Sequence, residues 1–138
     1  MNYRKGEGSM MRIIAIENSK KELDMLHQKI DAAFPGNSFE GFCDPFLAIR
    51  AYMTMPSDLT VFCRNMRIID GFTFTRTLRK NYSRFTGVML SEDENSRTDA
   101  EKYSLGYLKK PFEAADLRRL ASDMDRQADF SENQPYDL

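Results

Sequence analysis

Five short apolar runs alternate with longer amphipathic stretches along the 138-residue chain, and this alternation limits the possible folds more than any other feature. The runs are too short for ordinary helices, and the first, at residues 12–16, is rich in β-branched residues, which is typical of a strand buried on both faces of a sheet. A parallel sheet needs a crossover after each strand, and that crossover normally carries a helix across the sheet in a right-handed sense. We expect strands at residues 12–16, 38–42, 59–63, 87–90 and 106–109.

The stretches between these runs carry helix signals. Ser19 and Glu22 have the Ser-x-x-Glu spacing of a capping box, and apolar residues then recur at helical spacing until Pro35-Gly36. Asp44 followed by Pro45 predicts the start of a second helix. Three further helices are expected around residues 74–78, from 95 to 103, and after residue 111. The apolar face of the second helix is expected to consist of Phe46, Ala48, Ile49, Tyr52 and Met53.

This pattern predicts an α/β fold of the flavodoxin-like, doubly wound kind, with a five-stranded parallel sheet in the order 2-1-3-4-5 and helices on both faces. Functional groups in such sheets gather outside the carboxyl ends of the strands, where the first and third strands flank the switch in strand order. The polar residues that end or directly follow the strands are therefore expected to converge. They are Glu17, Asn18, Cys63, Ser91 and Lys110.

The length predicts one compact domain, which we expect to span residues 11–127. Residues 1–10 are predicted to be a flexible arm, a remnant of expression or an overlong start, since Met10 and Met11 stand directly before the first strand. Residues 128–138 are polar and acidic, and we expect this tail to be disordered.

The composition includes 41% hydrophobic and 30% charged residues with a formal net charge of −1, which gives no reason to expect direct binding to nucleic acid or a membrane. No apolar run approaches the roughly 20 residues that span a bilayer, and the first residues lack the apolar core of a secretory signal. We therefore predict a cytoplasmic location. Two cysteines and one histidine are too few for a disulfide framework or for most zinc sites.

The stretch from Cys63 to Gly71 resembles the phosphorylation loop of response-regulator receiver domains, the CheY-like family, which reads Asp-x-x-Met-Pro-x-Met-Asp-Gly. Met66 and Asp70-Gly71 occupy the family positions, whereas Cys63 stands where the family carries its phosphorylated aspartate, and Arg67 replaces the proline. The likeness extends over most of residues 11–127. It implies a place in two-component, or phosphorelay, signal transduction.

In receiver domains an acidic pair and the phosphorylated aspartate hold Mg²⁺ together with a loop carbonyl, and Mg²⁺ requires oxygen ligands. By resemblance, Glu17 and Asn18 correspond to the acidic pair and Asn65 supplies the carbonyl. Only one of the three expected negative charges remains if Cys63 is a neutral thiol. We therefore predict that the Mg²⁺ site has lost its function and that the chain uses no metal or other cofactor.

The phosphoryl-binding half of the site matches the family more closely. By resemblance, the switch hydroxyl, the switch aromatic residue, the phosphoryl-binding lysine and a candidate cis-proline are Ser91, Tyr107, Lys110 and Pro111. The lysine is expected to pair with Glu17 or Glu92 across the former metal site, because an unpaired buried ammonium is costly.

The resemblance therefore implies a degenerate receiver, or pseudo-receiver, which is not an enzyme and acts as a phosphorylation-independent protein-interaction module. Its partner would bind the surface of the fourth helix, fifth strand and fifth helix. That partner would be a second copy, another regulator or a kinase, with no direct nucleic acid, membrane or small-molecule substrate. The region of the second strand resembles receivers joined to LytTR-type DNA-binding domains, although no such output domain is expected within these residues. A basic, partly aromatic surface is expected from Lys102, Tyr103, Lys109, Arg118 and Arg119.

Two alternatives remain open. In the first, phosphate is accepted on another residue, and Asp70 is the nearest stand-in. In the second, Cys63 senses oxidation as a thiolate stabilised by Lys110 and Arg67. An inert, buried cysteine is favoured over the sensor. Cys43 is not expected to form a disulfide with Cys63, because two strand spacings of roughly 4.8 Å exceed the roughly 7 Å limit of a disulfide.

Overall fold

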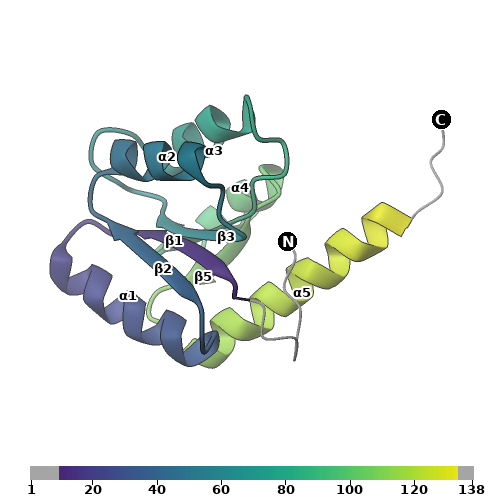
Figure 1. The fold of residues 1–138 in the computed structure, drawn as a ribbon, viewed down its shortest axis with the longest axis horizontal. Helices are drawn as coiled ribbons and strands as arrows, with labels where there is room; N and C mark the ends of the chain where they lie inside the picture. Colours follow the sequence, from purple (N-terminus) through teal and green to yellow (C-terminus); the bar gives the residue numbers. More distant parts are fainter. Residues whose placement is uncertain (1–9, 134–138) are drawn as a thin grey trace.

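The structure is a computed structural model that describes residues 10–133, with side chains as far as residue 127. Its centre is a five-stranded parallel sheet in the order β2-β1-β3-β4-β5, with helices on both faces (Figure 1). The predicted fold class and strand order are therefore confirmed. The strands are β1 (Arg12–Ile16), β2 (Ser38–Phe42), β3 (Leu59–Cys63), β4 (Gly87–Ser91) and β5 (Gly106–Lys109).

The helices divide between the two faces of the sheet, with α1 and α5 on one face and α2, α3 and α4 on the other (Figure 1). Alternate residues of β1 show this division, because Ile13 packs with α1 and α5 whereas Ile14 packs with α2 and α3. The strand is buried on both faces, as its apolar sequence predicts. The helices are α1 (Lys20–Ala33), α2 (Pro45–Thr54), α3 (Gly71–Arg79), α4 (Ser96–Lys102) and α5 (Ala114–Asn133).

The two helices that follow β1 and β2 begin at the predicted caps. The Ser19 hydroxyl accepts a hydrogen bond from the Glu22 amide at 3.2 Å, and the Asp44 carboxylate accepts one from the Phe46 amide at 2.8 Å. The apolar face predicted for α2 was partly wrong, because Phe46 and Met53 are 46% and 52% exposed. They lie one position after the two ends of the buried stripe, which has the helical spacing i, i+3, i+4, i+7. That stripe consists of Pro45, Ala48, Ile49 and Tyr52.

The last two helices differ in length. α4 has only seven residues and no side-chain hydrogen bond at its N-cap, whereas α5 has 20 residues and continues to Asn133. Residues 128–133, the first part of the tail for which disorder was predicted, lie in α5, where a nucleated helix gains a hydrogen bond with each added residue. The rest of that tail, 134–138, and the predicted arm at 1–9 lie outside the described residues. Even with this long α5, no helix within residues 10–133 has the length and apolar character needed to cross a membrane.

The loop between β3 and α3 contains a strained residue. Ile68 has a φ of +76° and lies at the centre of a turn in which the Ile69 amide donates to the Arg67 carbonyl at 2.8 Å. A left-handed conformation costs an L-residue roughly 1–2 kcal/mol, and it is rarer still for residues branched at Cβ. Ile68 is 73% exposed, so packing offsets little of this strain.

Replacing Ile68 with glycine is expected to raise the free energy of unfolding by about 0.5–1 kcal/mol, since glycine relieves the strain but loses more entropy on folding. Urea denaturation measures the difference. Ile68→Val is the matched control, because it keeps the branched Cβ, and its stability should change by less than about 0.5 kcal/mol. Equal stabilities of the glycine and valine variants would contradict a strained Ile68.

Candidate functional site

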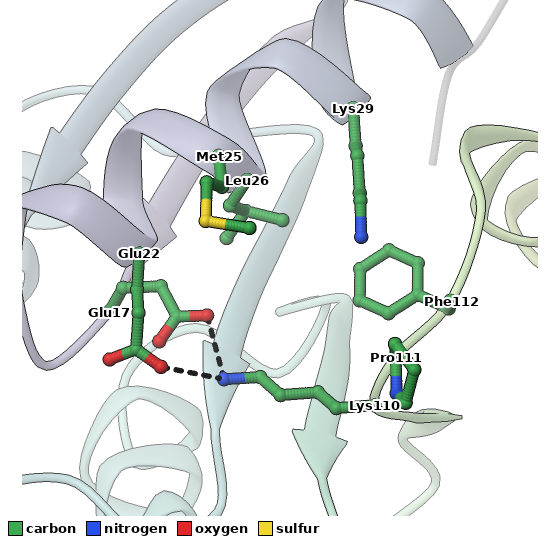
Figure 2. A pocket seen from close by; sticks show the side chains of 8 residues that line it. All are labelled: Glu17, Glu22, Met25, Leu26, Lys29, Lys110, Pro111 and Phe112. Carbon is green, nitrogen blue, oxygen red and sulfur yellow. Dashed lines mark ion pairs between the residues drawn. The ribbon is translucent and has the colours of Figure 1, made fainter.

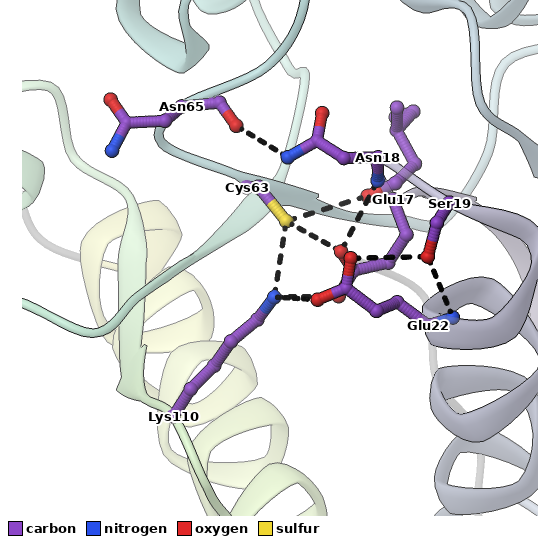
Figure 3. Close-up of polar contacts among 8 residues, drawn as sticks. Glu17, Asn18, Ser19, Glu22, Cys63, Asn65 and Lys110 are labelled. Carbon is purple, nitrogen blue, oxygen red and sulfur yellow. Dashed lines mark hydrogen bonds and ion pairs between the residues drawn. The ribbon is translucent and has the colours of Figure 1, made fainter.

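Polar side chains from the ends of three strands meet at one edge of the sheet (Figure 3). Glu17 and Asn18 directly follow β1, Cys63 is the last residue of β3, and Lys110 directly follows β5. Because the strands are parallel, their carboxyl ends lie at the same edge. The structure therefore brings these four residues together at the position that the sequence predicted.

Glu17 lies at the centre of the contacts among these residues. Its Oε1 accepts a hydrogen bond from the Cys63 thiol at 3.0 Å, and its Oε2 lies 2.9 Å from Lys110 Nζ. Lys110 Nζ also donates to Cys63 Sγ at 3.5 Å. Glu17 and Cys63 are only 3% and 4% exposed. Both oxygens of a buried carboxylate are thus satisfied by the side chains beside it.

A second carboxylate approaches the same lysine. Glu22 Oε2, from the first turn of α1, lies 3.9 Å from Lys110 Nζ (Figures 2 and 3). Of the two predicted partners of Lys110, Glu17 is confirmed, whereas Glu92 lies exposed in the turn after β4. Glu22 was assigned only to the capping box of α1, so its contact with Lys110 was not predicted from the sequence.

The protonation states follow from burial and from these contacts. Burial raises the pKa of the Cys63 thiol to about 12, and the charge and hydrogen bond of Glu17 act in the same direction against the opposing effect of Lys110. For Lys110, burial opposes the charge, but the hydrogen bonds and charges of Glu17 and Cys63 outweigh burial and raise its pKa. At neutral pH the site therefore holds a neutral thiol and an ammonium. The inert thiol that the sequence favours is therefore supported over the thiolate of the redox-sensor alternative, because burial beside a carboxylate outweighs one nearby cation.

The loop carbonyl at the metal-ligand position already has a partner. Asn18 Nδ2 donates a hydrogen bond to the Asn65 carbonyl at 2.8 Å (Figure 3). The Arg67 guanidinium, which was expected to act on Cys63, donates instead to the Asn18 carbonyl at 3.0 Å. Two hydrogen bonds therefore join the loop after β1 to the loop after β3.

The residues at the family's metal positions do not fit Mg²⁺, which prefers an octahedral set of oxygen ligands. Glu17 is the one carboxylate among them, and both of its oxygens have partners, while Cys63 offers sulfur and the Asn65 carbonyl is bound by Asn18. Among residues 10–133, no group of three or more histidine, cysteine, aspartate or glutamate side chains is arranged to hold a metal ion. The donor set suits an ion pair better than a divalent cation.

The other residues that the resemblance assigns to phosphoryl binding form hydrogen bonds within the turn between β4 and α4. Ser91 is buried, and its hydroxyl accepts a hydrogen bond from the Asp93 amide at 2.9 Å and lies 3.3 Å from the Ser96 hydroxyl. Tyr107 is also buried, and its hydroxyl donates to the Asp93 carbonyl at 2.6 Å. Both side chains are therefore bonded to the protein's own groups. The Lys110–Pro111 peptide is cis, as predicted.

A pocket of about 140 Å³ lies beside this network, between α1 and the segment that joins β5 to α5 (Figure 2). One end is polar, where Glu17, Glu22 and Lys110 meet. At the other end Lys29 lies over the Phe112 ring, with its ammonium 4.7 Å from the ring centroid. No feature of the sequence had indicated this pocket. Its lining residues are Glu17, Glu22, Met25, Leu26, Lys29, Lys110, Pro111 and Phe112.

Cys43 and Cys63 are both free thiols, as predicted. Cys43 directly follows β2 and Cys63 ends β3, and these two strands lie on either side of β1. Two strand spacings therefore separate the cysteines, which is beyond the reach of a disulfide.

The surface of α4, β5 and α5 is less basic than predicted, because two of its expected residues face elsewhere. Arg118 donates to the Ala33 carbonyl at 2.8 Å and so lies on the α1 side of α5. Tyr103 stacks on Phe72 of α3, with ring centroids 4.8 Å apart. The prediction failed because helical periodicity does not determine the direction of long side chains near helix ends.

The other predicted residues of that surface have acidic neighbours, which for Lys109 is Glu94. Lys102 lies 3.9 Å from Asp99, and Arg119 lies 3.4 Å from Asp116. Lys109 is exposed at the end of β5. Between α4, β5 and α5 runs a groove of mixed character, whose lining includes Arg97, Glu101, Leu105, Tyr107, Leu120, Asp123 and Met124.

Comparison with solved structures identifies the fold as that of response-regulator receiver domains. The chemotaxis response regulator CheY4 of Vibrio cholerae is similar with a TM-score of 0.74 and 21% sequence identity, over 84% of this chain and 99% of that chain. A response regulator receiver domain protein from Clostridium thermocellum is similar with a TM-score of 0.75 and 16% identity, over 88% of this chain and 98% of that chain. The sequence itself matches no family model and no curated protein.

Another structural neighbour belongs to a family of redox sensors in the streptococci that evolved from two-component response regulators. It is similar with a TM-score of 0.74 and 15% identity. The match covers 93% of this chain and 56% of that chain. At such identities the likeness concerns the fold alone.

Replacing Lys110 with methionine is expected to lower the free energy of unfolding by about 3 kcal/mol at neutral pH, since it leaves the Glu17 charge buried without its cation. Urea denaturation at neutral pH measures the loss. In the unmodified protein the pKa of Lys110 is raised above its ordinary value of 10.5. The stability from this group is therefore constant at neutral pH and is lost only as the pH rises through the raised pKa.

The double variant Glu17→Gln with Lys110→Met is the control for this prediction. It removes both charges, so most of the stability lost in Lys110→Met should return. A double variant as unstable as Lys110→Met would show that the lysine acts through its packing and not through its charge.

Cys63 is expected to react with iodoacetamide at neutral pH about three orders of magnitude more slowly in the folded protein than in the unfolded chain. The pKa of the Cys63 thiol is about 12, against an ordinary value of 9.0, and this lowers its thiolate fraction at neutral pH by about three orders of magnitude. A Cys43→Ser variant isolates the reaction of Cys63, and intact mass follows it with time. Equal rates in folded and unfolded protein would contradict a buried neutral thiol.

Proposed function

We propose that this chain, which has the fold of response-regulator receiver domains, is an atypical receiver of two-component signalling that binds protein partners without being phosphorylated. The observation that carries the proposal is the 2.9 Å contact between Lys110 and Glu17, with Cys63 bonded to both. This contact occupies the edge of the sheet where the family carries out phosphoryl transfer. We assign the module to the cytoplasm and regard it as a binding protein rather than an enzyme.

The chemistry of the site supports the loss of phosphoryl transfer. The reaction needs a nucleophile at the end of β3 and cations that neutralise the transferred group. Cys63 is a neutral thiol at that position, with a pKa of about 12, and is therefore a poor nucleophile at neutral pH. The charge of Lys110 is already compensated by a carboxylate 2.9 Å away.

The alternative acceptor, Asp70, has a structural role. Its carboxylate accepts a hydrogen bond from the Thr73 amide at 2.8 Å and forms the N-cap of α3. Such a cap stabilises a helix by about 1 kcal/mol. The Asp70 carboxylate is therefore already engaged at the start of α3, away from Lys110, which favours a domain without any acceptor.

The surface of α4, β5 and α5 supports the proposed binding of a protein. Leu120 and Met124 are half-buried on α5 and contribute apolar area to the groove there. Gly106 allows Met124 to pack directly on β5, since a Cβ on Gly106 would lie 2.6 Å from the Met124 sulfur. We propose a second copy, another regulator or a kinase as the partner. The likeness to receivers of LytTR-type regulators stays a prediction.

Redox sensing by Cys63 is the second candidate function. The structural likeness to a streptococcal redox sensor favours it, as does the 3.5 Å contact of Lys110 with the thiol. The burial of Cys63 and its raised pKa oppose it, because oxidation normally proceeds through an accessible thiolate. We therefore rank redox sensing below the binding module.

Incubation with acetyl phosphate and Mg²⁺, followed by intact mass measurement, tests the proposal, and we expect no phosphoryl adduct on the unmodified protein. The variant Asn18→Asp with Cys63→Asp is the positive control. It restores the carboxylates at the metal and acceptor positions, so it should form an adduct that depends on Mg²⁺. A stoichiometric adduct on the unmodified protein would overturn the proposal, and its location at Asp70 would establish the alternative acceptor.

A further inference from the structure

Positive charge is concentrated in one segment of the chain. Residues 59–91, which run from β3 through α3 to β4, contain six arginine and lysine residues and one aspartate, a formal charge of +5. The whole chain has a formal charge of −1, so the remaining residues carry −6. A basic region is therefore set in an otherwise acidic protein.

Two arginines and Phe72 of this region form a cluster with Tyr103, between α3 and the end of α4. The Phe72 and Tyr103 rings stack with their centroids 4.8 Å apart. The Arg64 guanidinium lies over Phe72 at 5.4 Å, and the Arg76 guanidinium lies over Tyr103 at 5.8 Å and donates to its hydroxyl at 2.9 Å. Lys80 is exposed one helical turn after Arg76. We call these five residues the α3 patch.

The arginines of the α3 patch have no carboxylate partner among the described residues. Two exposed arginines of α4 and α5 are paired, since Arg97 lies 2.6 Å from Glu94 and Arg119 lies 3.4 Å from Asp116. Arg64 Nε is buried without a hydrogen-bond partner, which is uncommon for a buried polar atom. The rings therefore hold two guanidiniums that lack the anionic acceptors such groups normally bind.

We propose that the α3 patch binds a carboxylate-rich segment of a partner protein, at a surface distinct from that of α4, β5 and α5. A guanidinium binds a carboxylate through two parallel hydrogen bonds, and holding it against a ring reduces the entropy lost on binding. Lys80 adds a third positive charge to the same side of α3. This inference does not depend on the state of Cys63 or Lys110, so its test is independent of the test by acetyl phosphate.

An acidic protein segment fits the α3 patch better than a nucleic acid does. Sites for single-stranded nucleic acid combine a basic groove with aromatic faces on which bases stack. Each ring of the patch already contacts the other ring and a guanidinium.

Fluorescence anisotropy with a labelled oligoglutamate peptide tests the inference. The unmodified protein should bind the peptide at low ionic strength, and added salt should weaken the complex. The variant Arg64→Gln with Arg76→Gln should lose affinity by about tenfold or more, because it removes both guanidiniums from the patch. The variant Arg64→Lys with Arg76→Lys keeps both charges but lacks the planar guanidinium groups, so its loss of affinity should be smaller than that of the glutamine variant.

The matched control is Arg50→Gln with Arg126→Gln, which removes the same charge from exposed positions of α2 and α5 and should change the affinity by less than about twofold. Thermal denaturation confirms that each variant is folded. Absence of peptide binding, or an equal loss in the control, would overturn the inference. So would tighter binding of a single-stranded oligothymidine, or a salt-dependent dimer that disappears with Arg64 and Arg76, because the occupant would then be a nucleic acid or a second copy.

Discussion

One buried ion pair holds the candidate site together. Glu17 and Lys110 follow β1 and β5, which are not neighbours in the sheet, and their side chains meet beside the end of β3. Removal of Lys110 leaves the buried Glu17 carboxylate without its cation, whereas removal of Glu17 leaves Lys110 with Glu22 alone, 3.9 Å away. Cys63 fits between them as a small neutral group that donates to the carboxylate and accepts from the ammonium.

The loops at this edge are also fixed by internal contacts. The Asn18 amide is bonded to the Asn65 carbonyl, and Ser91 and Tyr107 are both bonded to Asp93. In receiver domains these loops surround the metal and the phosphoryl group, according to the resemblance. In this chain each loop has a partner within the protein, so the arrangement does not need a ligand to complete it.

The fold and the location of the site could be predicted because they depend on local patterns. Short apolar runs and cap residues determine where strands and helices begin, and the crossover rule then brings the strand ends to one edge. The contacts within the site could not be predicted, because they depend on side-chain directions and burial. Glu22 was assigned only to a cap, Arg67 points to a loop carbonyl, and the pKa of Cys63 is raised by burial that the sequence does not display.

The hydrogen bond from Tyr107 to the Asp93 carbonyl has a consequence for how such a module would carry information. A domain whose turn is held by its own atoms presents one face to its partner at all times. The fraction of partner bound then follows from the abundance of the module and the dissociation constant, by mass action. The output of such a protein would then depend on its rates of synthesis and degradation, and so on gene dosage, rather than on a stimulus.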